Sequence, residues 1–146
     1  MSDFRAHLLE SDDEITALLE RVQSVAVLGI KTAETGAPAY WVPEYAQRAG
    51  LRILPVPVYY PDVREILGEP VVRTIGAIPE RVDLVNVFRR PRDIPAHLDD
   101  LLTAHPRAVW FQTGIRNDES AEQLARAGID VVQDRCLLVE LQERGR

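Results

Sequence analysis

The chain of 146 residues has one cysteine, one lysine and no long hydrophobic run. The single cysteine, Cys136, excludes an internal disulfide and a metal site built from several thiolates. A membrane-spanning helix needs about 20 consecutive apolar residues, so the sequence predicts no membrane association. Residues 1–13 are polar and acidic, unlike a secretory signal peptide, and we therefore expect a cytoplasmic protein.

Positive charge is also scarce. The 17 basic and 23 acidic residues give a formal net charge of -6 at pH 7. Non-specific binding of nucleic acid needs a basic surface, so we expect no nucleic-acid partner. The hydrophobic fraction of 46% is ordinary for a globular protein, and the length fits one domain. We expect this domain to span residues 1–146, with its core at about residues 14–141.

The two best-known nucleotide-binding fingerprints are absent. After Gly29 the next glycine is Gly36, so the chain lacks the Gly-x-Gly-x-x-Gly spacing of dinucleotide-binding loops. Val56 and Pro57 follow the second apolar run, where an NAD-binding protein carries an acidic residue for the ribose. The P-loop pattern of nucleotide triphosphatases does not occur either. These absences disfavour an NAD-binding protein and a nucleotide triphosphatase.

Short apolar runs alternate with amphipathic segments along the chain. The expected strands are Val25–Leu28, Arg52–Val56, Asp83–Phe88, Ala108–Phe111 and Ile129–Val132. The expected helices cover 12–22, 39–49, 118–127 and 136–142, with another from after Pro91 to near His105 and a helical turn over Val63–Leu67. This alternation predicts an α/β fold, a single Rossmann-like domain whose five-stranded parallel sheet has helices on both faces.

Ligands of such sheets bind at the carboxyl ends of the strands. The residues that follow the five expected strands include the cations Lys31, Arg89, Arg90, Arg116 and Arg135. The loop after the first strand leads into a helix start, where free backbone N–H groups and the helix dipole attract anions. The sequence therefore predicts that this edge of the sheet binds a polyanionic ligand.

Several segments together resemble a known family. They are Val25–Gly29, Pro55–Pro57, Val82–Pro91, Val109–Asn117 and Val132–Cys136. The blocks Asp-x-x-x-Val-Phe-Arg-x-Pro and Gln-x-Gly-Ile-Arg-Asn are the most specific of them. The chain resembles the small stand-alone CoA-binding proteins, which are similar to the N-terminal CoA-binding domain of the succinyl-CoA synthetase α subunit.

The resemblance implies that coenzyme A is the ligand, and it implies where the ligand lies. In the family, the loop after the first strand holds the phosphates and the segment after the second lines the adenine side. The segment after the third flanks the nucleotide and the pantetheine, and the Gln-x-Gly turn lies near the pantetheine end. The matching positions here are Gly29, Ile30, Lys31, Pro38, Tyr40, Val56, Pro57, Phe88, Arg89, Arg90, Gln112 and Gly114. One departure is Pro-Val-Pro-Val after the second strand, where the family commonly reads Pro-Val-Asn-Pro.

No catalytic constellation and no metal-ligand cluster is evident in the sequence. The histidines His7, His97 and His105 fall on expected helices or their ends, away from the strand edge, and are expected to be surface residues. Cys136 is expected to be structural, with a disulfide to the thiol of CoA as the alternative. The sequence thus favours non-catalytic binding of coenzyme A or a short acyl-CoA. The alternatives are an NAD(P)-dependent oxidoreductase and a subunit of a CoA-dependent ligase or transferase.

Overall fold

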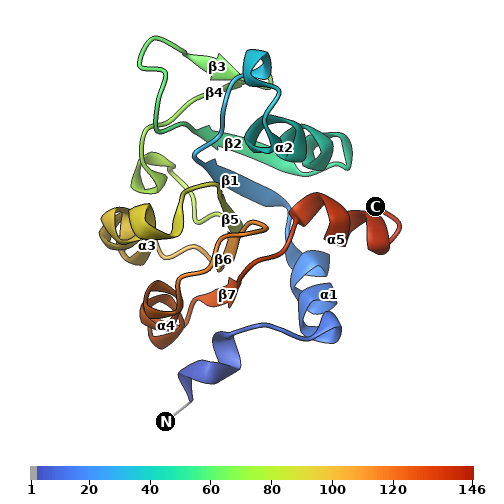
Figure 1. Cartoon of the computed structure of the whole chain (residues 1–146), viewed down its shortest axis with the longest axis vertical. Helices are drawn as coiled ribbons and strands as arrows, with labels where there is room; N and C mark the ends of the chain where they lie inside the picture. Colours follow the sequence, from blue (N-terminus) through green and yellow to red (C-terminus); the bar gives the residue numbers. More distant parts are fainter. Residues whose placement is uncertain (1–2) are drawn as a thin grey trace.

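The computed structural model describes residues 3–146 and contains one five-stranded sheet with helices on both faces (Figure 1). Its strands are β1 (Ser24–Leu28), β2 (Arg52–Val56), β5 (Leu84–Val87), β6 (Ala108–Phe111) and β7 (Asp130–Val132). The strand order is β2-β1-β5-β6-β7, and every neighbouring pair is parallel. Each strand agrees with its predicted range to within one residue at either end, so the Rossmann-like α/β fold is confirmed.

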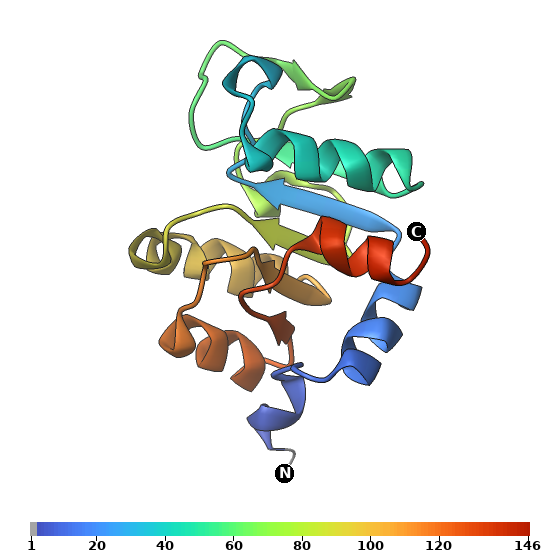
Figure 2. The same ribbon diagram turned by 45° about the vertical axis from the view of Figure 1, so that its right-hand side comes forward.

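Alternate residues of each strand face two separate cores. One core lies beneath α1 (Asp12–Arg21), α2 (Pro38–Arg48) and α5 (Leu137–Glu143), and the other beneath α3 (Leu98–Ala104) and α4 (Asp118–Arg126). Trp110 belongs to the first core and Phe111 to the second, and neither is exposed. Because both faces are covered (Figure 2), the strands are apolar at successive positions rather than alternately polar.

The first helix begins where the sequence predicts. The Ser11 hydroxyl accepts a hydrogen bond from the Glu14 N–H, and the Glu14 carboxylate accepts one from the Ser11 N–H, both at 3.1 Å. This reciprocal pair satisfies two backbone donors at the helix start, and the acidic first turn complements the helix dipole. The expectation of a helix over 12–22 is confirmed to within one residue.

The segment Val63–Leu67 is not helical, so that prediction is wrong. A small antiparallel hairpin lies there, formed by β3 (Glu65–Ile66) and β4 (Glu69–Pro70). Leu67 and Gly68 connect the two strands with positive φ angles of 56 and 75°. A two-residue connection of this kind fits the twist of a hairpin, and it favours strand pairing over a helical turn.

The segment after Pro91 is also not one continuous α-helix. It begins as the 3-10 helix η4 (Pro91–His97) and becomes α3 only at Leu98. Pro95 lies inside η4. Its backbone nitrogen has no hydrogen to donate, and its ring disfavours α-helical geometry at the preceding residue. Two further 3-10 turns, η2 (Ala33–Thr35) and η3 (Ile75–Ala77), lie in connections between strands.

The N-terminal segment covers the outer edge of the sheet. It contains the 3-10 helix η1 (Phe4–His7), which packs against α4, and Leu8 pairs in parallel with Val131 of β7. The edge strand β7 is therefore partly paired along its open side, which limits pairing with other chains. Among residues 3–146, no helix combines the length and apolar character needed to cross a membrane.

Candidate functional site

The strand order reverses at β1, which has β2 on one side and β5 on the other. In open parallel sheets, the crevice outside the carboxyl ends at such a point is the usual ligand site. Two backbone hydrogen bonds extend the sheet here. The Gly29 N–H donates to the Val56 carbonyl and the Phe88 N–H donates to the Leu28 carbonyl, both at 2.9 Å. The structure thus brings together the segments after β1, β2 and β5, as the sequence predicts.

Gly29 allows the loop after β1 to pass directly over the backbone that follows β5. Its φ angle is +89°, and a Cβ atom placed there would lie 2.5 Å from the Phe88 carbonyl oxygen and 3.3 Å from Arg89 Cδ. A side chain at this position would collide with a backbone atom, so the close approach requires glycine.

The loop after Gly29 closes back on the start of α2. The Lys31 N–H donates to the Ala39 carbonyl at 3.2 Å, and Pro38 is the first residue of the helix. The N–H groups of Thr32 and Ala33 have no acceptor assigned within residues 3–146. The loop therefore offers backbone donors to an anion next to a helix N-terminus.

Two opposite charges flank these donors. Lys31 is partly exposed and forms no ion pair with any residue between 3 and 146. A hydrogen bond from the Thr32 hydroxyl lowers the pKa of Glu34, so that carboxyl is an anion at neutral pH. An anionic ligand is thus attracted to the Lys31 side of the loop and repelled from the Glu34 side.

The Arg89 side chain is only 15% exposed and is already occupied by three neighbours. Its Nε donates to His97 Nε2 at 3.2 Å, its Nη1 donates to the Tyr59 hydroxyl at 3.4 Å, and its Nη2 lies 3.9 Å from Asp93. Burial, and then the charge of Arg89, lower the pKa of His97, which keeps Nε2 able to accept. The expectation that His97 lies away from the strand edge is therefore wrong.

Two of the remaining predicted cations, Arg90 and Arg116, lie in solvent-exposed ion pairs. Arg90 pairs with Asp93 at 2.8 Å and Arg116 pairs with Asp118 at 3.1 Å, and both arginines are more than half exposed. The arginine of such a pair readily exchanges its carboxylate partner for a ligand anion, because solvent screens the attraction between the two side chains.

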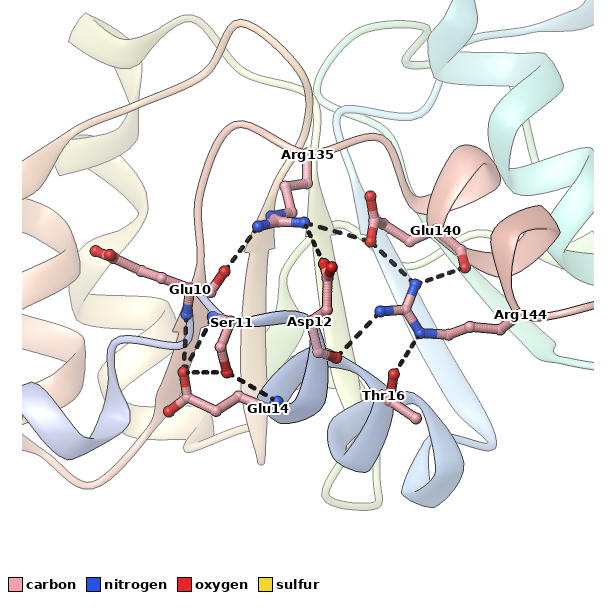
Figure 3. Close-up of polar contacts among 8 residues, drawn as sticks. All are labelled: Glu10, Ser11, Asp12, Glu14, Thr16, Arg135, Glu140 and Arg144. Atoms are coloured by element: carbon pink, nitrogen blue, oxygen red, sulfur yellow. Dashed lines mark hydrogen bonds and ion pairs between the residues drawn. The ribbon is translucent and has the colours of Figure 1, made fainter.

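Arg135 belongs to a cluster between α1 and α5 (Figure 3). Its guanidinium donates to the Glu10 carbonyl at 2.7 Å and lies 3.5 Å from Asp12 and from Glu140. Arg144 completes the cluster, with contacts to Glu140 at 3.0 Å and to the Thr16 hydroxyl at 2.8 Å. Arg135 is thus a structural residue, and its prediction as a ligand-facing cation is wrong.

Several of the predicted contact residues offer little side-chain surface. Ile30 is 1% exposed and Val56 is fully buried, and Pro57 is buried as well. They form the floor beneath the site and present almost no surface to a ligand. Tyr40 and Phe88 are partly exposed where they pack against the core beneath α1, α2 and α5.

Gln112 connects three elements. Its Oε1 accepts from Asn86 Nδ2 of β5 at 3.2 Å and from the Leu137 N–H at the start of α5 at 3.3 Å. Asn86 is completely buried, and its Oδ1 has no hydrogen-bond partner among residues 3–146. Cys136, the N-cap of α5, is partly exposed beside them. Asn86 could not be predicted as a site residue because it lies inside an apolar run.

The Gln-x-Gly turn after β6 is held by the segment after β7. The Gly114 N–H donates to Asp134 Oδ1 at 2.6 Å, and the Ile115 N–H donates to the Gln112 carbonyl at 2.9 Å. The turn keeps its predicted place at the strand edge, next to the start of α5.

Comparison with known proteins identifies the family. A sequence model described as "CoA binding domain" matches residues 23–142. The chain belongs to this family. The CoA-binding domain is 32% identical over 129 residues to "Uncharacterized protein YneT" of Bacillus subtilis, covering 88% of this chain and 93% of that protein. The resemblance predicted from the sequence is confirmed.

Solved structures share the fold. "The structure of cell-free ID.343 from Thermus thermophilus" is 39% identical, with a TM-score of 0.83 over 92% of this CoA-binding domain and 98% of that chain. A dinucleotide-forming acetyl-coenzyme A synthetase of Ca. Korarchaeum cryptofilum has a TM-score of 0.61 at 14% identity. That match covers 75% of this chain and 25% of the synthetase, and it is a likeness of fold alone.

An open groove of about 860 Å³ lies beside β7 and η1, at the far side of the sheet from β2, and the segments after β1, β2 and β5 do not line it. Its lining mixes acidic and basic side chains, among them Arg5, Glu10, Asp118 and Arg135. No group of three or more His, Cys, Asp or Glu side chains between residues 3 and 146 is placed to hold a metal ion.

Proposed function

We propose that this CoA-binding domain binds coenzyme A or a short acyl-CoA at the carboxyl ends of β1, β2 and β5, without a catalytic cycle of its own. The observation that carries the proposal is the loop after Gly29. That loop crosses the Phe88 backbone at a distance only glycine permits, and it leaves the N–H groups of Thr32 and Ala33 beside Lys31. Membership of the CoA-binding domain family supports the same ligand.

The residues at this edge fit the parts of coenzyme A. Lys31 and the two free N–H groups suit the pyrophosphate, because amides at a helix start and a nearby cation favour a dianion. Arg90 is exposed and suits the 3′-phosphate. The partly exposed rings of Tyr40 and Phe88 suit the less polar pantetheine chain. Coenzyme A would supply a thiol that carries acyl groups, and the protein would bind and orient it.

The end of β2 argues against NAD as the ligand. Proteins that bind NAD present a carboxylate there to the ribose hydroxyl groups. In this chain Val56 and Pro57 occupy that position with buried apolar side chains.

Calorimetric titration with coenzyme A, acetyl-CoA, NAD and NADP tests the proposal. We expect coenzyme A or acetyl-CoA to bind with one ligand per chain, and NAD and NADP to give no saturable heat. Binding of NAD in the absence of CoA binding would contradict the proposed function. Turnover of CoA or its thioesters by the purified chain would contradict the absence of a catalytic cycle.

The substitution Lys31→Ala tests the role of the loop after β1. We expect it to weaken CoA binding about fivefold at low salt and less at 0.5 M salt, because the lost interaction is electrostatic and partly exposed. Arg48→Ala is the matched control, since Arg48 is an exposed cation at the other end of α2. Equal affinities for wild type and Lys31→Ala at both salt concentrations would remove Lys31 from the site.

A further inference from the structure

Tyr59 is an exposed aromatic residue at the same edge of the sheet. It follows β2 by three positions, and 57% of its surface is accessible. Exposed aromatic rings are common on mobile loops, where they have no fixed orientation. The surroundings of Tyr59 are different, because both its backbone and its ring are held in place.

Arg73 holds the backbone of this loop. Its guanidinium donates to the carbonyl groups of Tyr59, Tyr60, Pro61 and Val63, at 3.2, 3.0, 3.3 and 2.8 Å respectively. Tyr60 has a φ angle of 64°, a left-handed conformation that is unfavourable for a residue other than glycine. The arginine keeps the loop in this conformation, with the Tyr59 ring at the surface.

Arg89 holds the ring itself. The guanidinium carbon of Arg89 lies 5.7 Å from the centre of the Tyr59 ring, and its Nη1 hydrogen-bonds the hydroxyl at 3.4 Å. The ring of Tyr60 meets that of Tyr59 edge-on, with 6.5 Å between the centroids and 88° between the planes. The cation–π contact with the Arg89 guanidinium stabilises the Tyr59 ring in this position.

The same arginine joins Tyr59 to the loop after β1. Arg89 Cδ lies 3.3 Å from the position that a Cβ atom on Gly29 would occupy, while its far end touches Tyr59. The proposed phosphate site and the exposed ring are therefore separated by one arginine side chain. A phosphate and an aromatic base joined by a sugar would match this arrangement.

We propose that Tyr59 is the stacking surface for the base of the bound ligand, which is the adenine of coenzyme A if the proposed function is correct. Every nucleobase has a π-face, and stacking on an aromatic side chain is worth about 1–3 kcal/mol by alanine substitution. Because the ring is already fixed by Arg89 and Arg73, little ordering is needed on binding. The inference rests on the proposed function and extends it to Tyr59, a residue that no sequence motif indicates.

The test compares ligands with and without the base. Affinities are measured for coenzyme A, 3′,5′-ADP and 4′-phosphopantetheine with wild type, Tyr59→Ala, Tyr59→Phe and, as a neighbouring control, Val58→Ala. We expect Tyr59→Ala to weaken binding of coenzyme A and of 3′,5′-ADP by about 5- to 100-fold and to leave 4′-phosphopantetheine unchanged. Tyr59→Phe keeps the ring and should stay within threefold of wild type, as should Val58→Ala.

The outcomes separate the two proposals. If wild type binds coenzyme A and Tyr59→Ala binds it equally well, the stacking role is wrong and the proposed function stands. The stacking role is also wrong if Tyr59→Ala weakens coenzyme A and 4′-phosphopantetheine to the same extent. If wild type binds none of the three ligands, both proposals are overturned. An unchanged thermal unfolding midpoint of Tyr59→Ala shows that any loss of affinity is not a loss of folding.

Discussion

The substitution Gly29→Ala is expected to lower the free energy of unfolding by roughly 2–6 kcal/mol and to abolish ligand binding. Two costs add here. A left-handed backbone costs a non-glycine residue about 1–3 kcal/mol, and an extra methyl group in a packed region costs about 1–3 kcal/mol. The methyl group would lie 2.5 Å from the Phe88 carbonyl oxygen, which is part of the backbone and cannot rotate away. Urea unfolding and CoA titration of the same sample measure both effects.

Gly128→Ala is the matched control for this experiment. Gly128 has a φ angle of +84°, close to that of Gly29, but apart from its chain neighbours no atom of the described residues 3–146 lies within 4 Å of the position of its Cβ atom. The control therefore carries the backbone cost without the collision, and we expect a loss of about 1–2 kcal/mol with ligand binding retained. Equal losses for the two variants would show that the contact with Phe88 contributes nothing.

The substitution Glu140→Ala is expected to destabilise the protein by about 2–4 kcal/mol. The Glu140 side chain is 8% exposed and lies between Arg144 and Arg135, whose side chains are 15% and 30% exposed. Removing the carboxylate leaves two partly buried cations without their common partner, and uncompensated buried charge is strongly unfavourable. Urea unfolding at neutral pH measures the loss.

The control for this second experiment is Glu122→Ala. Glu122 also pairs with an arginine, Arg126, at 3.5 Å, but the two side chains are 48% and 60% exposed. Solvent screens such a pair, so its removal is expected to cost less than about 0.5 kcal/mol. A cost of Glu140→Ala no larger than that of Glu122→Ala would contradict the structural role of the cluster in Figure 3.

The strands and most helices could be predicted because their signals are local. The run Ala108–Phe111 is apolar at every position, which marks a strand covered on both faces, and Ser11 with Glu14 marks a helix start. The order of the strands has no local signal, since it depends on contacts between distant segments. The hairpin at Glu65–Pro70 was missed because Leu67, an unusual residue for a left-handed turn, stands where glycine or asparagine is expected.

The geometry of the candidate site could be predicted best where the backbone determines it, and least where it depends on which partners the side chains contact. The role of Gly29 could be predicted because the residue comes directly after a buried strand. The five cations look equivalent in the sequence, yet Arg89 bonds His97 and Tyr59 while Lys31 has no ion pair in the described part of the chain. Arg135 is separated by 123 positions from Asp12, and no spacing rule links them.

The cluster between α1 and α5 also has a consequence for the order in which the molecule folds. Arg144 bonds the Asp12 carbonyl across 132 positions, and Arg146 bonds the Leu19 carbonyl across 127. Contacts of such long sequence separation form late, because the chain between them must lose its freedom before they contribute any stability. While the chain is being synthesised, the sheet face beneath α1 and α2 therefore stays partly uncovered until α5 has been made, and this is the interval in which its apolar strands are most exposed to aggregation.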